Sequence, residues 1–333
     1  MATLVALLGA GRIGKVHAKA IGAVDGAMLV AVADAFPEAA EALAQAYGAR
    51  VATIDEIAAA DDVDAVIICT PTDTHADLIE QFAKAGKAIF CEKPIDLSIE
   101  RVKSCLQTVE DHGATLMLGF NRRFDPHFSA VRDTILEGRI GDVEMVQITS
   151  RDPGAPPPGY IQSSGGIFRD MAVHDFDMAR FLLGEEFTTV YATGSVLVDP
   201  EIGKLGDYDS ATIVLTTASG KQCSISNSRR AAYGYDQRIE VHGSKGAVSA
   251  ENQRPVSIEV ATEDGYLRPP LHDFFMTRYT EAYAAEIKAF VEAIENGTQP
   301  SPTGEDGLKS LILGEAALKS VAERRAVGTD EIQ

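Results

Sequence analysis

Residues 4–24, LVALLGAGRIGKVHAKAIGAV, decide how the N-terminal part of this chain folds. An apolar run leads directly into a glycine motif, and a helical pattern follows it; the motif residues are Gly9, Gly11, Arg12, Ile13 and Gly14. In that context the first glycine permits a tight turn, the second lets a pyrophosphate approach the backbone, and the third allows helix–strand contact. The stretch predicts a dinucleotide-binding turn, the alternative being a structural turn in another α/β protein. Arg12 either contacts the pyrophosphate or is a solvated arginine.

The cofactor prediction depends on the end of the second apolar run. Asp34 stands there, where a carboxylate can accept a hydrogen bond from an adenosine ribose. A carboxylate at this place repels a 2′-phosphate, and the next residues, Ala35 and Phe36, bring no basic group. We therefore expect NAD as the cofactor, in preference to NADP.

The first 120 residues alternate short apolar runs with amphipathic segments. We expect helices at 14–24, 37–47, 75–86 and 98–112, between strands that read LVALLG, MLVAVAD, AVIICT, KAIFCE and ATLMLGF. Strands that are apolar on both faces and alternate with helices indicate a parallel, doubly wound sheet. The sequence predicts a Rossmann domain at residues 1–121.

The pattern changes after about residue 122. A connecting helix at 122–141 is followed by strand-like runs separated by turns, and two amphipathic helices close the chain at about 274–296 and 304–324. Consecutive strands of this kind favour an α+β domain with a largely antiparallel, open sheet. We assign residues 122–333 to substrate binding and oligomerisation, with the last helix able to pack back on the first domain.

Length, charge and cysteines limit the class of protein. At 333 residues the chain is long enough for two domains, and its formal net charge of −19 argues against nucleic acid or an anionic membrane as partner. It has no apolar run of transmembrane length and no basic region of a signal peptide. The four cysteines lack CxxC spacing, as expected for free thiols in a reducing cytoplasm.

Ligands of doubly wound sheets bind outside the carboxyl ends of the strands. Three predicted strands end in Pro71-Thr72, in Glu92-Lys93-Pro94 and in Asn121-Arg122-Arg123. Lys93 is either a surface lysine in a turn or an ammonium group aimed at a substrate. Pro94 keeps Lys93 out of the helical region and stiffens the turn, so position alone leaves both open.

A second functional stretch is GGIFRDMAVHDFDMARFLLG, residues 165–184. On a regular α-helix Asp170, His174 and Asp177 fall within about 60° of one another, whereas Asp175 lies about 100° from His174. The stripe is compatible with a salt-bridged core helix, a metal site or a proton-transfer site. We expect no metal, because catalytic zinc usually has two nitrogen or sulfur ligands and the remaining histidines occur singly, most of them expected at the surface or on helix faces.

Together these motifs resemble the glucose–fructose oxidoreductase / inositol dehydrogenase / MocA family. The resemblance rests on GAGRIG, Asp34, PT at 71–72, EKP at 92–94 and the GG…D…HD…D segment. Within the family, SRDP at 150–153, YGYDQR at 233–238 and FFMTRYTEAYAAE at 274–286 look most like inositol 2-dehydrogenases. The resemblance implies NAD-dependent oxidation of myo-inositol to 2-keto-myo-inositol by a homotetramer. The alternatives are another inositol stereoisomer, a pyranose such as glucose or xylose, and a non-enzymatic NAD sensor.

The resemblance also implies site residues. Lys93, Asp170 and His174 map onto the family's catalytic set, and their chemistry suits alcohol oxidation: an imidazole as general base, a carboxylate that orients it, and an ammonium that stabilises an alkoxide. Beyond the glycine motif and Asp34, we expect cofactor contacts from Thr70, Pro71, Thr72, His75, Glu92 and Lys93. A polyol needs hydrogen-bonding partners, for which the candidates besides the catalytic set are Asn121, Arg122, Asp152, Asp177, Tyr233 and Tyr235.

Overall fold

The computed structural model describes residues 2–332, which form two compact units. The first unit comprises the residues up to Asp125 together with Thr280–Leu311, and the second comprises Pro126–Tyr279 and the residues from Ile312 onward. The sequence-based boundary at 121/122 lies close to Asp125, but the segment Thr280–Leu311 belongs to the first unit. The assignment of cofactor binding to one domain, and of substrate binding and oligomerisation to the other, stays a prediction.

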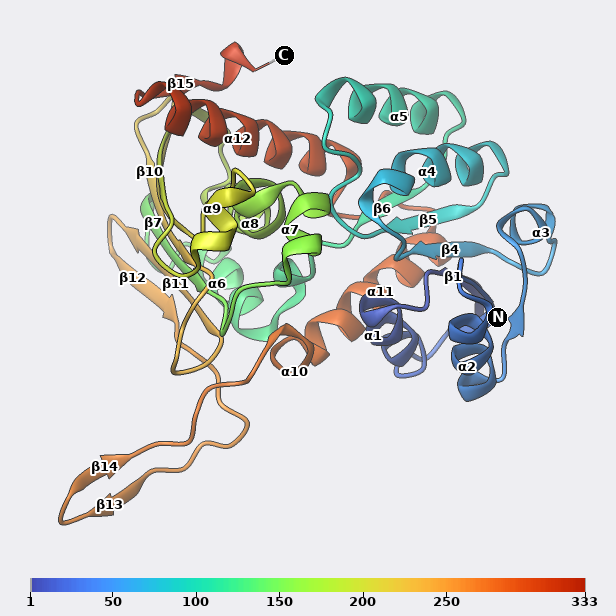
Figure 1. Cartoon of the computed structure of the whole chain (residues 1–333), viewed down its shortest axis with the longest axis horizontal. Helices are drawn as coiled ribbons and strands as arrows, with labels where there is room; N and C mark the ends of the chain where they lie inside the picture. The colour runs from blue at the N-terminus through green and yellow to red at the C-terminus, as the bar shows by residue number, and fades with distance from the viewer. Residues whose placement is uncertain (1, 333) are drawn as a thin grey trace. The chain divides into compact units, whose positions relative to one another are not determined.

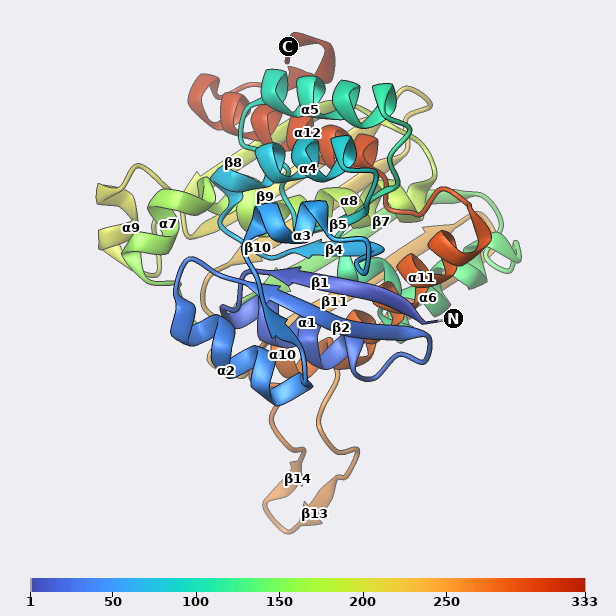
Figure 2. The same cartoon turned by 90° about the vertical axis from the view of Figure 1, so that its right-hand side faces the viewer.

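The first unit is built on a parallel sheet of six strands in the order β3-β2-β1-β4-β5-β6. The strands are β1 (Thr3–Leu8), β2 (Ala27–Ala33), β3 (Arg50–Val51), β4 (Ala65–Ile68), β5 (Ala88–Cys91) and β6 (Leu116–Leu118). The helices are α1 (Arg12–Ile21), α2 (Pro37–Tyr47), α3 (Ile54–Ala59), α4 (His75–Lys84), α5 (Ile99–Asp111) and α11 (Thr280–Asn296). Helices α4 and α5 cover one face of the sheet, and α1 and α2 cover the other (Figures 1 and 2). The predicted Rossmann domain is confirmed.

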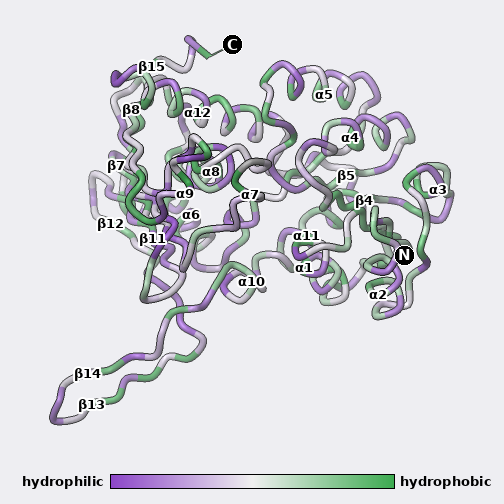
Figure 3. The backbone as a smooth tube through the Cα atoms, in the orientation of Figure 1, coloured by the Kyte–Doolittle hydropathy of each residue, from purple (hydrophilic) through white to green (hydrophobic). Residues whose placement is uncertain are grey.

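Local sequence explains these elements. All four residues of β4 are buried, as are five of the six residues of β1, because helices lie on both faces of the sheet. The same strands appear as hydrophobic segments in Figure 3. Ser98 caps α5 by accepting a hydrogen bond from the N–H of Arg101, and Thr53 forms a capping box with Glu56 that begins α3. Helix α3 is not among the helices predicted from the sequence.

The second unit contains a sheet of seven strands in the order β12-β11-β7-β10-β9-β8-β15. Its strands are β7 (Val143–Arg151), β8 (Phe187–Ser195), β9 (Ser210–Thr217), β10 (Gln222–Ser228), β11 (Asp236–Gly243), β12 (Gly246–Ala250) and β15 (Val327–Gly328). Only the pair β7–β10 is parallel, so the predicted α+β domain with a largely antiparallel sheet is confirmed. A separate hairpin, β13 (Val260–Thr262) with β14 (Gly265–Leu267), extends from this sheet (Figure 1).

Helices complete the second unit. They are α6 (Pro126–Leu136), α7 (Pro158–Ser164), η3 (Ile167–Met171), α8 (Ala172–Leu183), α9 (Pro200–Lys204) and α10 (Phe275–Arg278), while α12 (Gly304–Glu323) begins in the first unit and ends in the second. Helix α8 packs against β7 and β10. Among residues 2–332, no helix combines the length and apolarity needed to cross a membrane.

Several predicted elements differ in extent. The helix expected at 122–141 is only α6, because Asn121–Phe124 (η2) forms a 3₁₀ turn and Gly138 and Gly141 have positive φ angles. The helix expected at 274–296 is divided into α10 and α11. Among the strand-like runs of the second part, VSIEVAT (256–262) contains only the short strand β13. The short elements α7, α9, β3, β12, β14 and β15 were not predicted, since few apolar residues in them follow a clear period.

Candidate active site

The glycine turn lies between β1 and α1 and has the geometry that its sequence predicts. Gly9 has φ +96°, and a Cβ atom there would lie 2.6 Å from the carbonyl oxygen of Cys69. A Cβ on Gly14 would lie 1.9 Å from the carbonyl oxygen of Gly9. By contrast, no heavy atom of the described residues lies within 4 Å of a Cβ on Gly11. The turn is therefore closely packed at its first and third glycines and open at its second, where a pyrophosphate would approach.

Asp34 connects the end of β2 to this turn. Its Oδ2 accepts a hydrogen bond of 2.5 Å from the backbone N–H of Ala10, and its Oδ1 accepts one of 2.8 Å from the N–H of Phe36. Arg12 is exposed at the beginning of α1, and Ile13 is half-buried. The carboxylate predicted to bind the ribose thus orders the glycine turn, a role that the sequence did not indicate.

The other predicted cofactor residues lie at the same edge of the sheet. Backbone hydrogen bonds join the successive strand ends: Gly9 N–H to Ala33 O, Cys69 N–H to Leu8 O, Glu92 N–H to Ile68 O and Gly119 N–H to Cys91 O. The first unit therefore brings together at one edge the glycine turn, Asp34, Thr70, Pro71, Thr72, His75, Glu92, Lys93, Asn121 and Arg122. Lys93 is half-buried, whereas Asn121 and Arg122 are buried in η2.

Two histidines of the first unit, both on helices, are buried. His75 has Nε2 2.8 Å from the carbonyl oxygen of Thr70 and Nδ1 2.8 Å from that of Pro94. His17 is 0% exposed, and its Nε2 lies 2.7 Å from Oε1 of Glu92. Helix periodicity could have identified His17, because it shares the buried face of α1 with Gly14, Ala18 and Ile21.

The second unit contains Asp170 and His174. Asp170 lies in the π-helical turn η3, so the premise of one regular α-helix, from which the 60° stripe was computed, is wrong. Its Oδ1 accepts a 2.9 Å hydrogen bond from the Tyr160 hydroxyl, and its Oδ2 lies 3.7 Å from Nη2 of Arg229. His174 is half-buried and is the sole residue among 171–180 that is not fully buried.

The remaining acidic residues of α8 are part of the core. Asp175 is fully buried, and its Oδ2 accepts a 2.7 Å hydrogen bond from Asn227. Asp177 is 1% exposed and lies 3.9 Å from Nη1 of Arg180. Asp177, expected on the same face as His174, is thus buried beside Arg180, as the salt-bridged alternative for this helix predicts.

The other predicted substrate residues of the second unit have different surroundings. Asp152 is half-buried just after β7. Tyr233 is half exposed, and its hydroxyl donates a 2.5 Å hydrogen bond to Asp236; burial and this carboxylate raise the pKa of Tyr233. Tyr235 is buried and packs edge-on against the rings of Phe274 and Tyr279. Tyr235 therefore contributes its ring to an aromatic cluster.

The sequence matches known families over most of its length. Residues 3–120 match the oxidoreductase family's NAD-binding Rossmann fold, and residues 132–329 match its C-terminal alpha/beta domain. The chain belongs to the GFO/IDH/MocA oxidoreductase family. This confirms the resemblance inferred from the motifs.

Relatives within the GFO/IDH/MocA family cover nearly the whole chain. An inositol 2-dehydrogenase of Rhizobium meliloti is 72% identical over 321 residues, which are 96% of this chain and 97% of the relative. The crystal structure of a myo-inositol dehydrogenase from Corynebacterium glutamicum is 44% identical with a TM-score of 0.95, covering 98% of this chain and 99% of that one. The structure of a scyllo-inositol dehydrogenase from Lactobacillus casei, with bound NAD(H) and scyllo-inositol, is 29% identical with a TM-score of 0.93, covering 99% and 100%.

Proposed function

We propose that this protein is an NAD-dependent inositol 2-dehydrogenase that oxidises myo-inositol to 2-keto-myo-inositol. The observation that carries the proposal is the 72% identity to an inositol 2-dehydrogenase over 96% of the chain. Lys93, Asp170 and His174 stand at the positions of the family's catalytic motifs, which supports an enzyme over a cofactor-sensing protein, because a sensor has no use for a general base.

The first unit fits NAD. The open space at Gly11, the helix N-terminus at Arg12 and the carboxylate of Asp34 provide a place for a pyrophosphate and for a ribose diol. We assign the glycine motif, Asp34, Thr70–Thr72, His75, Glu92 and Lys93 to this cofactor. NAD, when it is bound, accepts the hydride that leaves the substrate carbon. A 2′-phosphate beside Asp34 would be repelled, which is why we propose NAD in preference to NADP.

The proton of the oxidised hydroxyl goes to His174. An imidazole is suited to this transfer because its ordinary pKa is close to neutral pH. Asp170, held by Tyr160 and Arg229, orients the histidine and can bond a substrate hydroxyl. The ammonium of Lys93 stabilises the alkoxide that forms as the substrate hydroxyl loses its proton to His174. Lys93 and His174 belong to different units, and this mechanism requires both to contact the same substrate molecule.

A cyclic polyol offers only hydroxyl groups for recognition. Asn121, Arg122, Asp152, Tyr233 and Tyr235 are our candidates for its further hydrogen bonds. A site built in this way rejects a substrate that leaves a buried polar group unpaired. Since a relative with bound scyllo-inositol has the same fold, oxidation of another inositol stereoisomer is the second candidate function.

Initial rates with a panel of myo-inositol, scyllo-inositol, glucose and xylose test the substrate. We expect the highest kcat/KM with myo-inositol, and higher values with another compound would refute the assignment. The variant His174→Ala tests the mechanism: we expect kcat to fall about 100- to 10,000-fold, the usual contribution of a general base, with unchanged NAD affinity. His242→Ala, at an exposed histidine of the same unit, is the control and should keep the wild-type kcat.

We further propose that the enzyme is a cytoplasmic homotetramer. One face of the second unit's sheet exposes Met145, Tyr191 and Val214 on three strands. The hairpin β13–β14 exposes further apolar residues, among them Val260, Tyr266 and Leu267. Apolar surface of this extent favours subunit contacts. Light scattering coupled to size-exclusion chromatography would contradict the proposal if it gave the mass of one chain, 35.5 kDa.

A further inference from the structure

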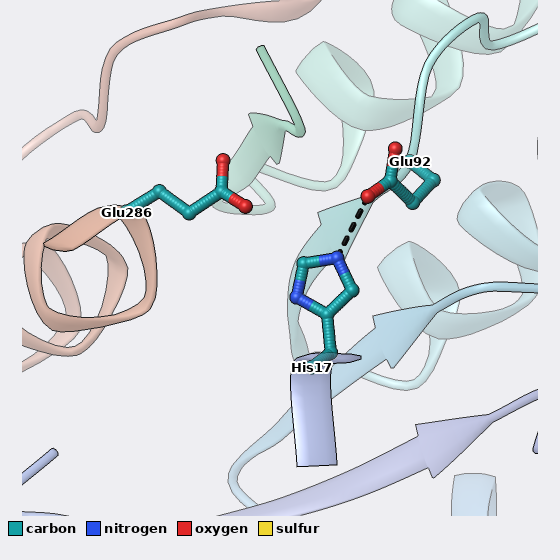
Figure 4. A group of neighbouring side chains, drawn as sticks. All are labelled: His17, Glu92 and Glu286. Carbon is teal, nitrogen blue, oxygen red and sulfur yellow. Dashed lines mark hydrogen bonds and ion pairs between the residues drawn. The ribbon is translucent and has the colours of Figure 1, made fainter. Parts of the chain in front are cut away.

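Three ionisable side chains are buried together in the core of the first unit (Figure 4). They are His17 from α1, Glu92 after β5 and Glu286 from α11, with exposed fractions of 0%, 9% and 0%. One nitrogen or oxygen atom from each lies within 4.8 Å of the others. Burial of such groups costs several kcal/mol per charge unless they are paired, so the cluster requires an explanation.

Within the cluster, His17 bonds directly to Glu92, whereas Glu286 points toward the pair. Neither carboxyl oxygen of Glu286 has a hydrogen-bond partner among the described residues. Burial, together with the negative charge of Glu92, raises the pKa of Glu286 well above its ordinary value. A neutral Glu286 allows two carboxyl groups to lie close together without the repulsion of two like charges.

The side chain of Glu92 is enclosed on two sides. On one side is the ring of His17, whose own orientation is fixed by edge-on contacts with Phe90 and Tyr283 at centroid distances of 5.2 and 5.4 Å. On the other side is Gly119 after β6, where an added Cβ would lie 3.1 Å from the Glu92 carboxyl group. The cluster therefore fixes Glu92 between α1 and the end of β6.

Glu92 immediately precedes Lys93, and the residue that follows Lys93 is also held by a buried histidine. The carbonyl oxygen of Pro94 lies 2.8 Å from Nδ1 of His75, which comes from α4. The two neighbours of Lys93 are thus attached to two different helices, one through a side chain and the other through the backbone. This arrangement limits the movement of the turn that carries the lysine.

We propose that His17, Glu92 and Glu286 form a buried positioning cluster for Lys93, which holds the lysine where its ammonium acts on the substrate oxygen. The inference rests on the proposed role of Lys93 in the reaction. His17 and Glu286 act through the turn and do not touch substrate. A metal ion bound by the same three side chains is the alternative, but His17 and Glu92 bond to each other directly, whereas a metal ion would stand between them.

A double-mutant cycle with His17→Gln and Lys93→Gln tests the proposal. We expect His17→Gln to lower kcat about 10- to 100-fold, because displacement of a catalytic group by about 1 Å has effects of this size. In the Lys93→Gln background the same substitution should change kcat less than about 2-fold, since residues that act through one another are not additive. An equal loss in both backgrounds would overturn the positioning role. If Lys93→Gln alone keeps the wild-type kcat, the proposed role of Lys93 fails instead, and this inference fails with it.

Further variants distinguish a positioning effect on Lys93 from simple unfolding of the protein. Glu286→Gln replaces the carboxyl group by an uncharged amide of similar volume and should keep kcat within about 3-fold. Glu286→Ala should lower kcat about 10-fold, again only when Lys93 is present. His112→Gln, at an exposed histidine of the same unit, is the matched control. If the purified protein contains one equivalent of a metal ion that Glu286→Gln removes, the cluster is a metal site and the proposal is overturned.

Discussion

The glycine turn permits a prediction in which two similar substitutions have opposite effects. In Gly14→Ala the new Cβ would lie 1.9 Å from the carbonyl oxygen of Gly9, so α1 and the turn must separate by about 1.5 Å to reach ordinary contact distance. We expect a loss of about 3 kcal/mol in the free energy of unfolding, the upper end for overpacked sites, because the obstacle is backbone. For a unit of this size that loss lowers Tm by about 6–12 °C.

In Gly11→Ala the new Cβ meets no heavy atom of residues 2–332 within 4 Å, and the backbone at φ −71° and ψ −162° accepts alanine. We therefore expect an unchanged Tm in the absence of cofactor. The methyl group occupies the space through which a pyrophosphate approaches the backbone, so the Kd for NAD should rise at least about 10-fold.

Differential scanning fluorimetry without NAD and isothermal titration calorimetry with NAD measure the two effects. Gly14→Ala should change both quantities, because the turn itself moves, and Gly11→Ala should change only the affinity. Wild-type NAD affinity in Gly11→Ala would refute the assignment of the turn to the cofactor. A wild-type Tm in Gly14→Ala would refute the packing argument.

Three further predictions follow from side-chain environments. Asp34→Ala should narrow the NAD/NADP preference in kcat/KM and also lower Tm, because the N–H of Ala10 loses its acceptor; an unchanged ratio would contradict the ribose role. Hydrogen bonds from three backbone N–H groups, that of Leu197 among them, lower the pKa of Asp209, although burial alone would raise it. Asp209→Ala should therefore lower the free energy of unfolding above about pH 4, and this difference from wild type should shrink as the pH falls below about 4. Burial raises the pKa of Cys105 to about 12, and all four cysteines are buried, so a thiol reagent at pH 8 should modify none of them before the protein unfolds. The free energy of unfolding should fall above about pH 9, because thiols ionise there in the unfolded chain but not in the folded one.

The Rossmann sheet was predictable because its signals are local. Strands buried on both faces produce continuous apolar runs, and turns with positive φ require glycine, so β1, Gly9 and α1 could be placed from about twenty residues. The carboxyl edge followed from topology, because parallel strands end at the same side of a sheet. These relations do not depend on the structure of the remaining residues.

The π-helical turn at η3 could not be predicted in this way, because distant residues determine it. Gly166 has φ +82° and lies against the carboxylate of Asp207, which also accepts a 3.0 Å hydrogen bond from the N–H of Ile167. Arg229 lies close to the carboxylates of both Asp170 and Asp207. A helical period calculated from residues 165–184 alone contains none of these contacts, which is why it did not predict the π-helical turn at Asp170.

The buried cluster around Glu92 was missed for a related reason, and it explains why the first unit includes a segment from the end of the chain. His17 and Glu92 are 75 residues apart, and Glu286 comes from α11, far beyond the residues that form the sheet. Helix α11 packs along α1, and its Phe290 contacts Phe90 of β5 at a centroid distance of 5.8 Å. The same helix thus covers the apolar surface of the sheet and supplies the carboxyl group of Glu286 beside Glu92. Since Glu92 adjoins Lys93, the C-terminal third of the chain takes part in shaping the turn on which the proposed catalysis depends.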